Sequence, residues 1–395
     1  MAPDASIPTD DPGVAVVGVG LISPLGLSPW STLRALLEGR RTADRLADLP
    51  DGLDATAVAR ATGAVSVAVH AAEDPALDLA ERAARQALAD AQLAPGSADA
   101  ARTPVWIASS KGAVLSLLDP RSEGRAQAIA AGPVGLVAAR VRDRLGLGAA
   151  SAPVAACATS LVALAGAVHA VRRGECARAL VVAVESALHP VFVRSYERLG
   201  ALAPATPAAA HVARPLDRGR AGFTLCEVSA AVVLERFGAR RSPWARAGAL
   251  ATGAEPFDMV RPPDRYATLE QLARRLCAGA DRIALVQPHA PGTADNDERE
   301  LAALARALGD ASAQTPAYAS KGALGHGLGA AGLVNVVLSC LFMRCGRVPP
   351  MPWLCEPIGT PFSLSRVGGA LAHGPHLVVA QGFGGHVAAV RLDPP

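Results

Sequence analysis

Short, almost wholly apolar segments alternate with longer segments of helical periodicity along this chain, and that alternation limits the folds open to it. Val14–Val17, Thr103–Ile107 and Arg178–Val184 have the length and the β-branched content of buried strands. Asp78–Gln92, which lies between the first two, carries apolar residues at helical spacing. Strands that are apolar on both faces belong in a sheet covered by helices on each side, so the pattern predicts a layered α/β fold.

The chain has 395 residues, more than one hydrophobic core usually serves, so we expect two halves. The Pro/Arg-rich stretch Arg240–Arg246 is the predicted seam between them. After the seam the pattern predicts a strand at 245–252, a helix at 266–279, a strand at 283–286, a helix at 296–308, a long helix from about Gly329, and strands at 377–380 and 387–392.

Composition excludes several kinds of partner. The net charge is +3 and aromatic residues make up only 4%, so we expect neither a basic nucleic-acid footprint nor a base-stacking surface. The seven cysteines form no C-x-x-C pair, which predicts reduced thiols, a cytoplasmic protein and no metal site. The acidic residues 1–11 do not resemble a secretory signal. Val154–Val171 lacks charged side chains but contains Ser, Thr, Gly and His, so we expect a buried core helix rather than a membrane span.

Cys157 is the first candidate for chemistry. It follows the short segment Pro153–Ala156, which we predict to be a strand, and precedes an apolar helix at Ala158–Arg172. A thiol at the start of a helix lies near backbone N–H groups and the positive end of the helix dipole, which favour the thiolate. The same position also suits an ordinary buried cysteine, and position alone leaves both interpretations open.

Two histidines lie on loops where α/β folds bind ligands. His289 follows the predicted strand at 283–286, and His326 lies in the glycine-rich segment Ser320–Gly329. The glycines of that segment let the backbone approach another group closely. A phosphate-binding loop is the alternative for this segment, but Lys321 precedes the glycines, which is the wrong order for a Walker sequence. For His289 the alternative is a solvated loop side chain.

A glycine-rich turn, Gln381-Gly-Phe-Gly-Gly-His386, joins the last two predicted strands. Such a turn can offer a backbone N–H to an oxyanion. One cysteine and two histidines on strand-end loops fit the pattern of an activated thiol with neighbouring imidazoles. Each signal is weak alone, whereas their combination in this order is specific.

These segments resemble the β-ketoacyl synthases of fatty-acid and polyketide synthesis, the condensing enzymes with a Cys-His-His triad. The likeness runs from Val14 to Arg391, nearly the whole chain. The matching segments are Val14–Gly26, Ala156-Cys-Ala-Thr-Ser-Leu161, Arg214-Pro-Leu-Asp217 with Arg220, Gly222, Phe223 and Glu227, Lys321–Gly332 (KGALGHGLGAAG) and Gly382-Phe-Gly-Gly385. The segment Lys321–Gly332 is the most specific of them.

The resemblance implies a thiolase-like fold of two similar βαβαβαββ halves in five layers of helix and sheet. The nucleophilic cysteine then belongs to an N-terminal half at residues 12–238, and the two catalytic histidines to a C-terminal half at residues 239–393. A homodimer is implied, and a heterodimer with a related subunit is possible within the family. The implied partner is an acyl carrier protein, loaded with either an acyl or a malonyl group.

The resemblance also implies roles for single residues. Cys157 takes the acyl chain from the carrier protein. His289 and His326 hold the thioester oxygen of malonyl carrier protein as carbon dioxide leaves, and Lys321 orders His326. The implied product is a 3-oxoacyl carrier protein, and no metal or organic cofactor is needed because decarboxylation itself generates the carbanion.

Further residues complete the implied site. The backbone N–H groups of Cys157 and Phe383 form the oxyanion hole, and Gly382 and Gly384 flank Phe383 in the gate. Thr293 is the remaining hydroxyl on the loop that helps to hold the malonyl carboxylate.

Several positions depart from the family pattern. Pro291 replaces a second hydroxyl near the malonyl carboxylate, and it supplies neither O–H nor N–H. His386 and Val387 replace a hydroxyl and an amide after the gate. Asn335 replaces the glutamate that commonly pairs with the lysine, which should make a buried Lys321 easier to neutralise. In the central signature, residues 226, 228, 229 and 230 are also unusual.

Because these departures surround the malonyl site, three functions remain open. The first is decarboxylative condensation, in fatty-acid or, as we prefer, polyketide or secondary-metabolite synthesis. The second is an acyltransferase that moves the acyl group from Cys157 to another nucleophile without decarboxylation. The third is a partner subunit of a ketosynthase heterodimer, which the intact Cys157 disfavours. A biosynthetic thiolase is less expected still, because thiolases use a second cysteine in place of one of these histidines.

Overall fold

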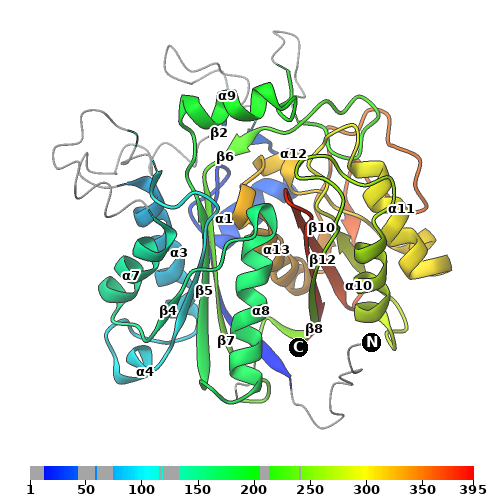
Figure 1. The fold of residues 1–395 in the computed structure, drawn as a ribbon. Coiled ribbons are helices and arrows are strands. Elements are labelled where there is room, and N and C mark those ends of the chain that lie inside the picture. The colour runs from blue at the N-terminus through cyan, green and yellow to red at the C-terminus, as the bar shows by residue number, and fades with distance from the viewer. Residues whose placement is uncertain are drawn as a thin grey trace.

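The computed structural model describes residues 13–42, 58–59, 74–114, 118, 133–204, 213–239 and 242–395 (Figure 1). The acidic residues 1–11 and residues 240–241 of the predicted seam lie outside these described residues. The predicted α/β class is confirmed, because a nine-stranded sheet has helices on both of its faces.

The N-terminal half begins with a buried strand and ends with another. Its elements are β1 (Val14–Ile22), α1 (Pro29–Leu37), β2 (Val58–Ala59), α3 (Pro75–Asp90), α4 (Ala98–Ala101), β3 (Val105–Ala108), α7 (Val134–Leu145), β4 (Ala150–Ser151), the 3-10 turn η2 (Ala156–Ala158), α8 (Thr159–Arg172), β5 (Arg178–Glu185), α9 (Pro190–Arg198), β6 (Leu225–Cys226) and β7 (Val228–Arg236).

The C-terminal half repeats the alternation. Its elements are β8 (Ala245–Ala254), α10 (Ala267–Cys277), β9 (Leu285–Gln287), α11 (Asp297–Leu308), η3 (Gly309–Gln314), α12 (Lys321–Leu324), η4 (Leu328–Ala330), α13 (Ala331–Cys345), β10 (Arg347–Val348), β11 (Gly369–Ala370), β12 (His376–Gly382) and β13 (His386–Asp393).

The two halves share one strand pattern. In the first, β3 pairs with β5 in parallel, and β5–β7 and β7–β1 are antiparallel. In the second, β9 pairs with β12 in parallel, and β12–β13 and β13–β8 are antiparallel. The halves join where β1 pairs with β8, from Val14 opposite Ala247 to Val16 opposite Ala245. The expected likeness of the two halves is therefore present in the order and direction of their strands.

The helices and sheets form five layers. Helices α3 and α7 cover the outer face of the first half-sheet, and α10 and α11 lie on the opposite side of the molecule beyond β8 and β13 (Figure 1). Helices α8 and α13 lie between the half-sheets, since α8 contacts β5 and β8 while α13 contacts β7 and β12. This central position explains why both helices are apolar all round.

One of the central helices is long and apolar enough to be considered as a membrane span. Leu328–Cys345 is the one helical stretch of the described chain long and apolar enough to cross a membrane, and 83% of it is buried in the molecule. Val154–Val171 contains all of α8 except Arg172, and α8 packs against the sheet as the predicted core helix.

One predicted strand is wrong. Pro153–Ala156 does not pair with a neighbouring strand; β4 ends at Ser151, and the chain turns into η2 at Ala156. The reason is local, because the Ala155 N–H donates to Thr159 Oγ1 at 2.8 Å and is not available to a ladder. Thr159 in turn donates to the Ala156 carbonyl at 2.6 Å.

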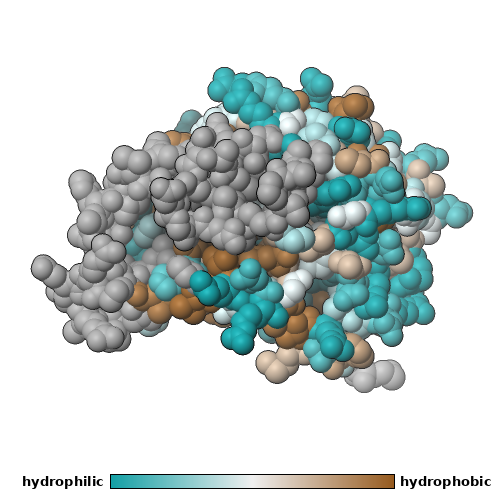
Figure 2. All heavy atoms as spheres, turned by 90° about the horizontal axis from the view of Figure 1, so that it is seen from above, coloured by the Kyte–Doolittle hydropathy of each residue, from teal (hydrophilic) through white to brown (hydrophobic). Residues whose placement is uncertain are grey.

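Apolar side chains also reach the surface. The face seen from above exposes apolar areas next to strongly hydrophilic ones (Figure 2). Among the large apolar side chains that are exposed, the highest fractions belong to Val367 at 83%, Met259 at 79% and Phe257 at 65%. Met259 and Phe257 lie on the loop that follows β8, where such surface is available for contact with another protein.

Candidate active site

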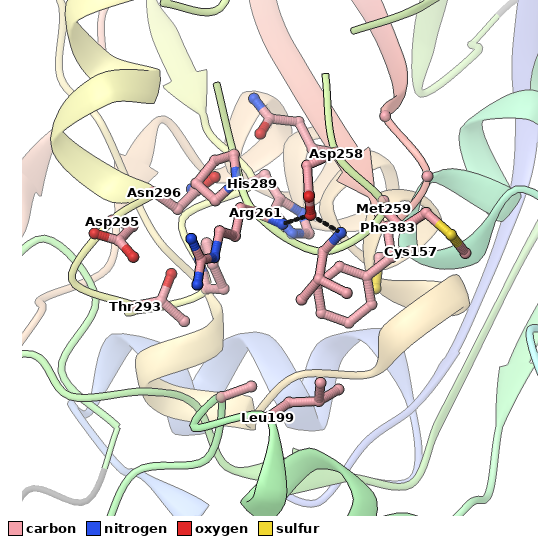
Figure 3. Close-up of a pocket in the computed structure, with 18 of the residues that line it drawn as sticks. Cys157, Leu199, Asp258, Met259, Arg261, His289, Thr293, Asp295, Asn296 and Phe383 are labelled. Atoms are coloured by element: carbon pink, nitrogen blue, oxygen red, sulfur yellow. Dashed lines mark hydrogen bonds between the residues drawn. The ribbon is translucent and has the colours of Figure 1, made fainter. Parts of the chain in front are cut away.

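A cavity of about 490 Å³ lies between the two halves and reaches the surface near that loop. Cys157, His289 and His326 all line it, as do Thr293 and the gate residues 382–384. In Figure 3, His289, Asn296 and Thr293 come from one side of the cavity, and Cys157 and Phe383 from the other. The structure thus brings together every predicted site residue except Lys321.

Cys157 is held on a tight turn at the floor of the cavity. It lies in η2, two residues before the start of α8, and Ala156 before it has φ 48°, a value that alanine rarely adopts. Burial raises the pKa of the thiol to about 11, against an opposing effect from Lys321. The thiolate expected from the helix start is therefore not the resting form; Cys157 rests as a thiol that needs a base.

A buried carboxylate holds the backbone of the His289 loop. Glu300 on α11 accepts hydrogen bonds from the N–H of His289 at 2.6 Å and of Ala290 at 2.8 Å. Asn296 donates a further bond to Glu300 at 3.0 Å. Burial raises the pKa of Glu300 to about 7. These bonds fix the loop at a point where Ala290 has φ 32°, again strained for a residue with a side chain.

The glycine-rich loop that carries His326 packs against residues 224–228. The N–H of His326 donates to the Thr224 carbonyl at 2.6 Å, and the Cys226 N–H donates to the His326 carbonyl at 3.3 Å. A Cβ at Gly327 would collide with Val228, and one at Gly325 would lie 3.0 Å from the Thr224 carbonyl. The glycines therefore serve packing against β6 and β7, and the phosphate-loop alternative loses its basis.

The two histidines lie close together and are buried. Their ring centroids are 5.3 Å apart with planes at 73°, and Phe223 packs edge-on against His326 at 4.8 Å. Burial lowers the pKa of both imidazoles well below the usual value, and Lys321 lowers it further. Both rings are consequently neutral at physiological pH and able to accept a proton.

Lys321 lies behind the histidines and does not line the cavity. Its Nζ donates a short hydrogen bond to the backbone carbonyl of His289. Burial lowers the pKa of Lys321 to about 8, while the negative charge of Glu300 acts in the opposite direction. Asn335 accepts a hydrogen bond from Ser320 Oγ at 2.6 Å. The carboxylates that raise the pKa of Lys321 are Glu300 and, more weakly, Asp297.

The gate closes tightly over the nucleophile. Gly382 ends β12, and a Cβ there would lie 2.9 Å from the Cys157 nitrogen and 2.8 Å from the Ala155 carbonyl. Only glycine fits this approach. Phe383 begins the three-residue turn to β13 and is 36% exposed, and Gly384, with φ 81°, needs the freedom of glycine.

The departures from the family pattern divide into two groups. Pro291, His386 and Val387 line the cavity, whereas Asn335 is buried on α13 away from it. Thr293 remains in the wall next to Pro291, and its carbonyl accepts a bond from Arg220 Nε at 3.1 Å.

Sequence reasoning missed the buried acids that support the site. Glu300 and Asp297 stand in the first turn of α11, where acidic residues usually cap a solvated helix. In the structure both are fully buried, and Asp297 accepts bonds from the N–H groups of Leu216 and Gly292. Nothing in the sequence separates them from Glu298 in the same turn, whose side chain is exposed. In the described part of the chain, no group of three His, Cys, Asp or Glu side chains could hold a metal ion.

Comparison with known proteins identifies the family. The profile of the beta-ketoacyl synthase N-terminal domain matches residues 11–238, and that of the C-terminal domain matches residues 251–354. A β-ketoacyl synthase assigned to granaticin polyketide formation in Streptomyces violaceoruber is 29% identical, over 97% of this chain and 98% of that protein. The 3-oxoacyl-[acyl-carrier-protein] synthase 2 of Rhizobium meliloti is 28% identical, over 85% of this chain and 87% of its own.

A solved ketosynthase shows the same fold. It is the type II polyketide ketosynthase in complex with its acyl-carrier protein and bound to a hexaketide, which superimposes with a TM-score of 0.82 at 21% identity, over 97% of this chain and 99% of that one. The fold is that of the thiolase-like condensing enzymes, as the family resemblance of the sequence implied. The chain belongs to the β-ketoacyl synthase family.

Proposed function

We propose that this protein performs a decarboxylative Claisen condensation in polyketide or related secondary-metabolite synthesis, with Cys157, His289 and His326 as its catalytic residues. The observation that carries the proposal is the single cavity in which one buried thiol faces two neutral imidazoles. Known relatives act in polyketide and fatty-acid synthesis, which supports the reaction class.

The first step transfers the acyl group. The Cys157 sulfur attacks the thioester carbonyl of the acyl carrier protein as a neutral imidazole takes the thiol proton. The carbon–sulfur bond to the carrier then breaks, and the departing thiolate receives that proton. The N–H groups of Cys157 and Phe383 would bind the tetrahedral oxyanion; the contact of Gly382 with the Cys157 nitrogen supports their closeness.

The second step makes the carbon–carbon bond. The carboxylate of the malonyl thioester leaves as carbon dioxide, and its bonding electrons form an enolate whose oxygen His289 and His326 would bind. The enolate carbon attacks the acyl-Cys157 carbonyl, and the sulfur leaves as thiolate to take up a proton. Lys321 is a positioning residue here, because it donates to the His289 backbone and does not reach the cavity.

The mouth of the cavity suits an acyl carrier protein. Exposed apolar side chains, Leu199, Met259, Val260 and Phe383, surround it together with Arg198 and Arg261. Apolar contact plus arginine fits an acidic carrier that inserts a thioester arm. We further propose a cytoplasmic dimer, a homodimer or a heterodimer with a related subunit, and the division into halves at residues 238 and 239.

Pro291 supports one second candidate, acyl transfer without decarboxylation. It lines the cavity beside Thr293 and offers neither O–H nor N–H at a place where the family has a hydroxyl. With that hydroxyl gone, the acyl group on Cys157 could pass to another nucleophile. The partner-subunit alternative is weaker, since the nucleophile is in place at the cavity floor.

Intact-protein mass spectrometry tests the proposal. The protein is incubated with acyl carrier protein thioester, and then with malonyl carrier protein, followed by product analysis. Acylation of Cys157 and then a 3-oxoacyl product is the expected result. Acylation without carbon–carbon bond formation would favour the second candidate, acyl transfer without decarboxylation.

A further inference from the structure

Two residues of the cavity lining stand at the starts of neighbouring helices. Tyr266 directly precedes α10 and Asn296 directly precedes α11, and the two helices pack against each other. Both residues line the cavity and are buried, with exposed fractions of 4% and 6%. Neither has a role in the two reaction steps described above.

Asn296 differs from most asparagines that precede a helix. At this position the side chain commonly accepts a hydrogen bond from an N–H of the first helical turn. The Asn296 side chain makes no such bond to α11, and its backbone is already helical, with φ −89° and ψ −54°. Its carboxamide instead bonds to two other side chains: Oδ1 accepts from the Tyr266 hydroxyl at 2.5 Å, and Nδ2 donates to Glu300 Oε2 at 3.0 Å.

These bonds continue to a proposed catalytic residue. Glu300 accepts the backbone N–H of His289 at 2.6 Å through its other oxygen, Oε1. Three hydrogen bonds in series therefore connect the Tyr266 hydroxyl, through Asn296 and Glu300, to the peptide that carries the His289 ring. Tyr266 is thus linked to the position of His289, although the two residues lie on different loops.

The Tyr266 hydroxyl fixes the orientation of the Asn296 carboxamide. The last torsion of an asparagine side chain has broad preferences, so hydrogen bonds decide which way the amide points. An ionised Glu300 only accepts, so the amide NH₂ faces it and Oδ1 faces Tyr266, which donates. Loss of the hydroxyl would leave Oδ1 buried without a donor, which is costly, and would free the carboxamide to turn away from Glu300.

We propose that Tyr266 and Asn296 are positioning residues, which hold His289 through Glu300 where its ring can bind the thioester oxygen of the malonyl group. Their loss displaces the ring and slows decarboxylation, while the surface that receives malonyl carrier protein stays in place. A small displacement of a reacting group is enough to slow a reaction without changing the affinity for the substrate. The inference rests on the proposed function, since it takes His289 as a catalytic residue.

The first test removes only the hydroxyl. Release of carbon dioxide from malonyl carrier protein is measured at steady state, and Tyr266→Phe should lower kcat ~5-fold with KM unchanged. Tyr318→Phe is the matched control, because Tyr318 is equally buried and its hydroxyl has no hydrogen-bond partner among the described residues. It should leave both constants at the wild-type values. An unchanged kcat in Tyr266→Phe, or a change in KM alone, would overturn the proposal.

A second variant tests whether the bonds act in series. Asn296→Leu removes both bonds of the carboxamide with little change in side-chain shape, so kcat should fall at least as far as in Tyr266→Phe. Because Tyr266 acts only through Asn296, adding Tyr266→Phe to Asn296→Leu should lower kcat no further. Independent, multiplying effects of the two substitutions would mean that Tyr266 contacts the substrate directly, which would contradict a positioning role.

A spectroscopic measurement without substrate separates this inference from the proposed function. The protein is labelled with ¹³C at histidine Cε1, and the NMR resonance of His289 is assigned by its loss in His289→Ala. Tyr266→Phe should shift this resonance, and Tyr318→Phe should leave it in place. A shift in a protein that releases no carbon dioxide from malonyl carrier protein supports the inference and counts against the proposed function alone. A His289 resonance that Tyr266→Phe does not move would overturn the inference.

Discussion

The floor of the cavity and its wall are built differently. On the floor, Cys157, His289 and His326 lie on backbone that is fixed by buried hydrogen bonds, by close glycine contacts and by Glu300. In the wall, Pro291 and Val387 present apolar side chains to the cavity. The carboxamide of Gln381, also in the wall, has no hydrogen-bond partner among the described residues. A change in the floor alters the reacting groups or the backbone that holds them, whereas a change in the wall alters what is bound.

This difference agrees with the position of three of the departures from the family pattern. Pro291, His386 and Val387 all lie in the wall, and the nucleophile and both histidines of the floor are unchanged. The other departures, Asn335 and residues 226, 228, 229 and 230, do not line the cavity. The predictions below test the floor first, where the expected effects are largest, and then the wall.

Replacement of the nucleophile should have the largest effect. Cys157→Ala removes the sulfur that accepts the acyl group, so acyl-enzyme formation should fall by at least ~10³-fold. The readout is the mass increase of the intact protein on incubation with acyl carrier protein. Cys355→Ser, at an exposed thiol, is the control and should acylate like the wild type. Undiminished acylation of Cys157→Ala would remove Cys157 from the mechanism.

Glu300→Gln should destabilise the floor. Each carboxylate oxygen accepts a backbone N–H, from His289 or Ala290, and the amide NH₂ of glutamine would face one of these donors. The free energy of unfolding should fall by about 1.5–3 kcal/mol, measured by chemical denaturation above the raised pKa of about 7. Glu298→Gln, on an exposed side chain of the same helix, should change it by less than about 0.5 kcal/mol. Equal effects of the two changes would contradict a fixed floor.

Much of this architecture was predictable from the sequence, and the exceptions have physical reasons. Apolar runs predicted β5 and β13 closely, because burial on both faces leaves a clear pattern. Pro153–Ala156 has the same apolar character, but a threonine hydroxyl four residues on takes its N–H, which no pattern reveals. Glu300 and Gln381 show the same limit, since the sequence gives a residue type but not whether it is buried or has a partner.

Pro291→Thr should affect the wall without disturbing the floor. A restored hydroxyl beside Thr293 can donate to the malonyl carboxylate, so release of carbon dioxide from malonyl carrier protein should rise by about 10-fold. Pro291→Val is the matched control, since valine has the shape of threonine without the hydroxyl. Equal rates in the two variants would show that the hydroxyl is irrelevant and that shape alone matters there.

The smallest effect should be the response of the floor to acid. Burial, Lys321 and, for His289, the neighbouring His326 lower the pKa of both histidines well below 6.5, so neither ring gains a proton as the pH falls from neutrality through 6.5. A histidine exposed to solvent would gain its proton around pH 6.5, and in the protonated form it could no longer accept the Cys157 proton. The rate constant for Cys157 acylation should therefore show no histidine titration near pH 6.5. A sigmoidal loss of the acylation rate constant centred on pH 6.5, in the wild type and in the Pro291→Thr variant alike, would mean that the histidines of the floor are exposed to water. The contrast between floor and wall would then be wrong.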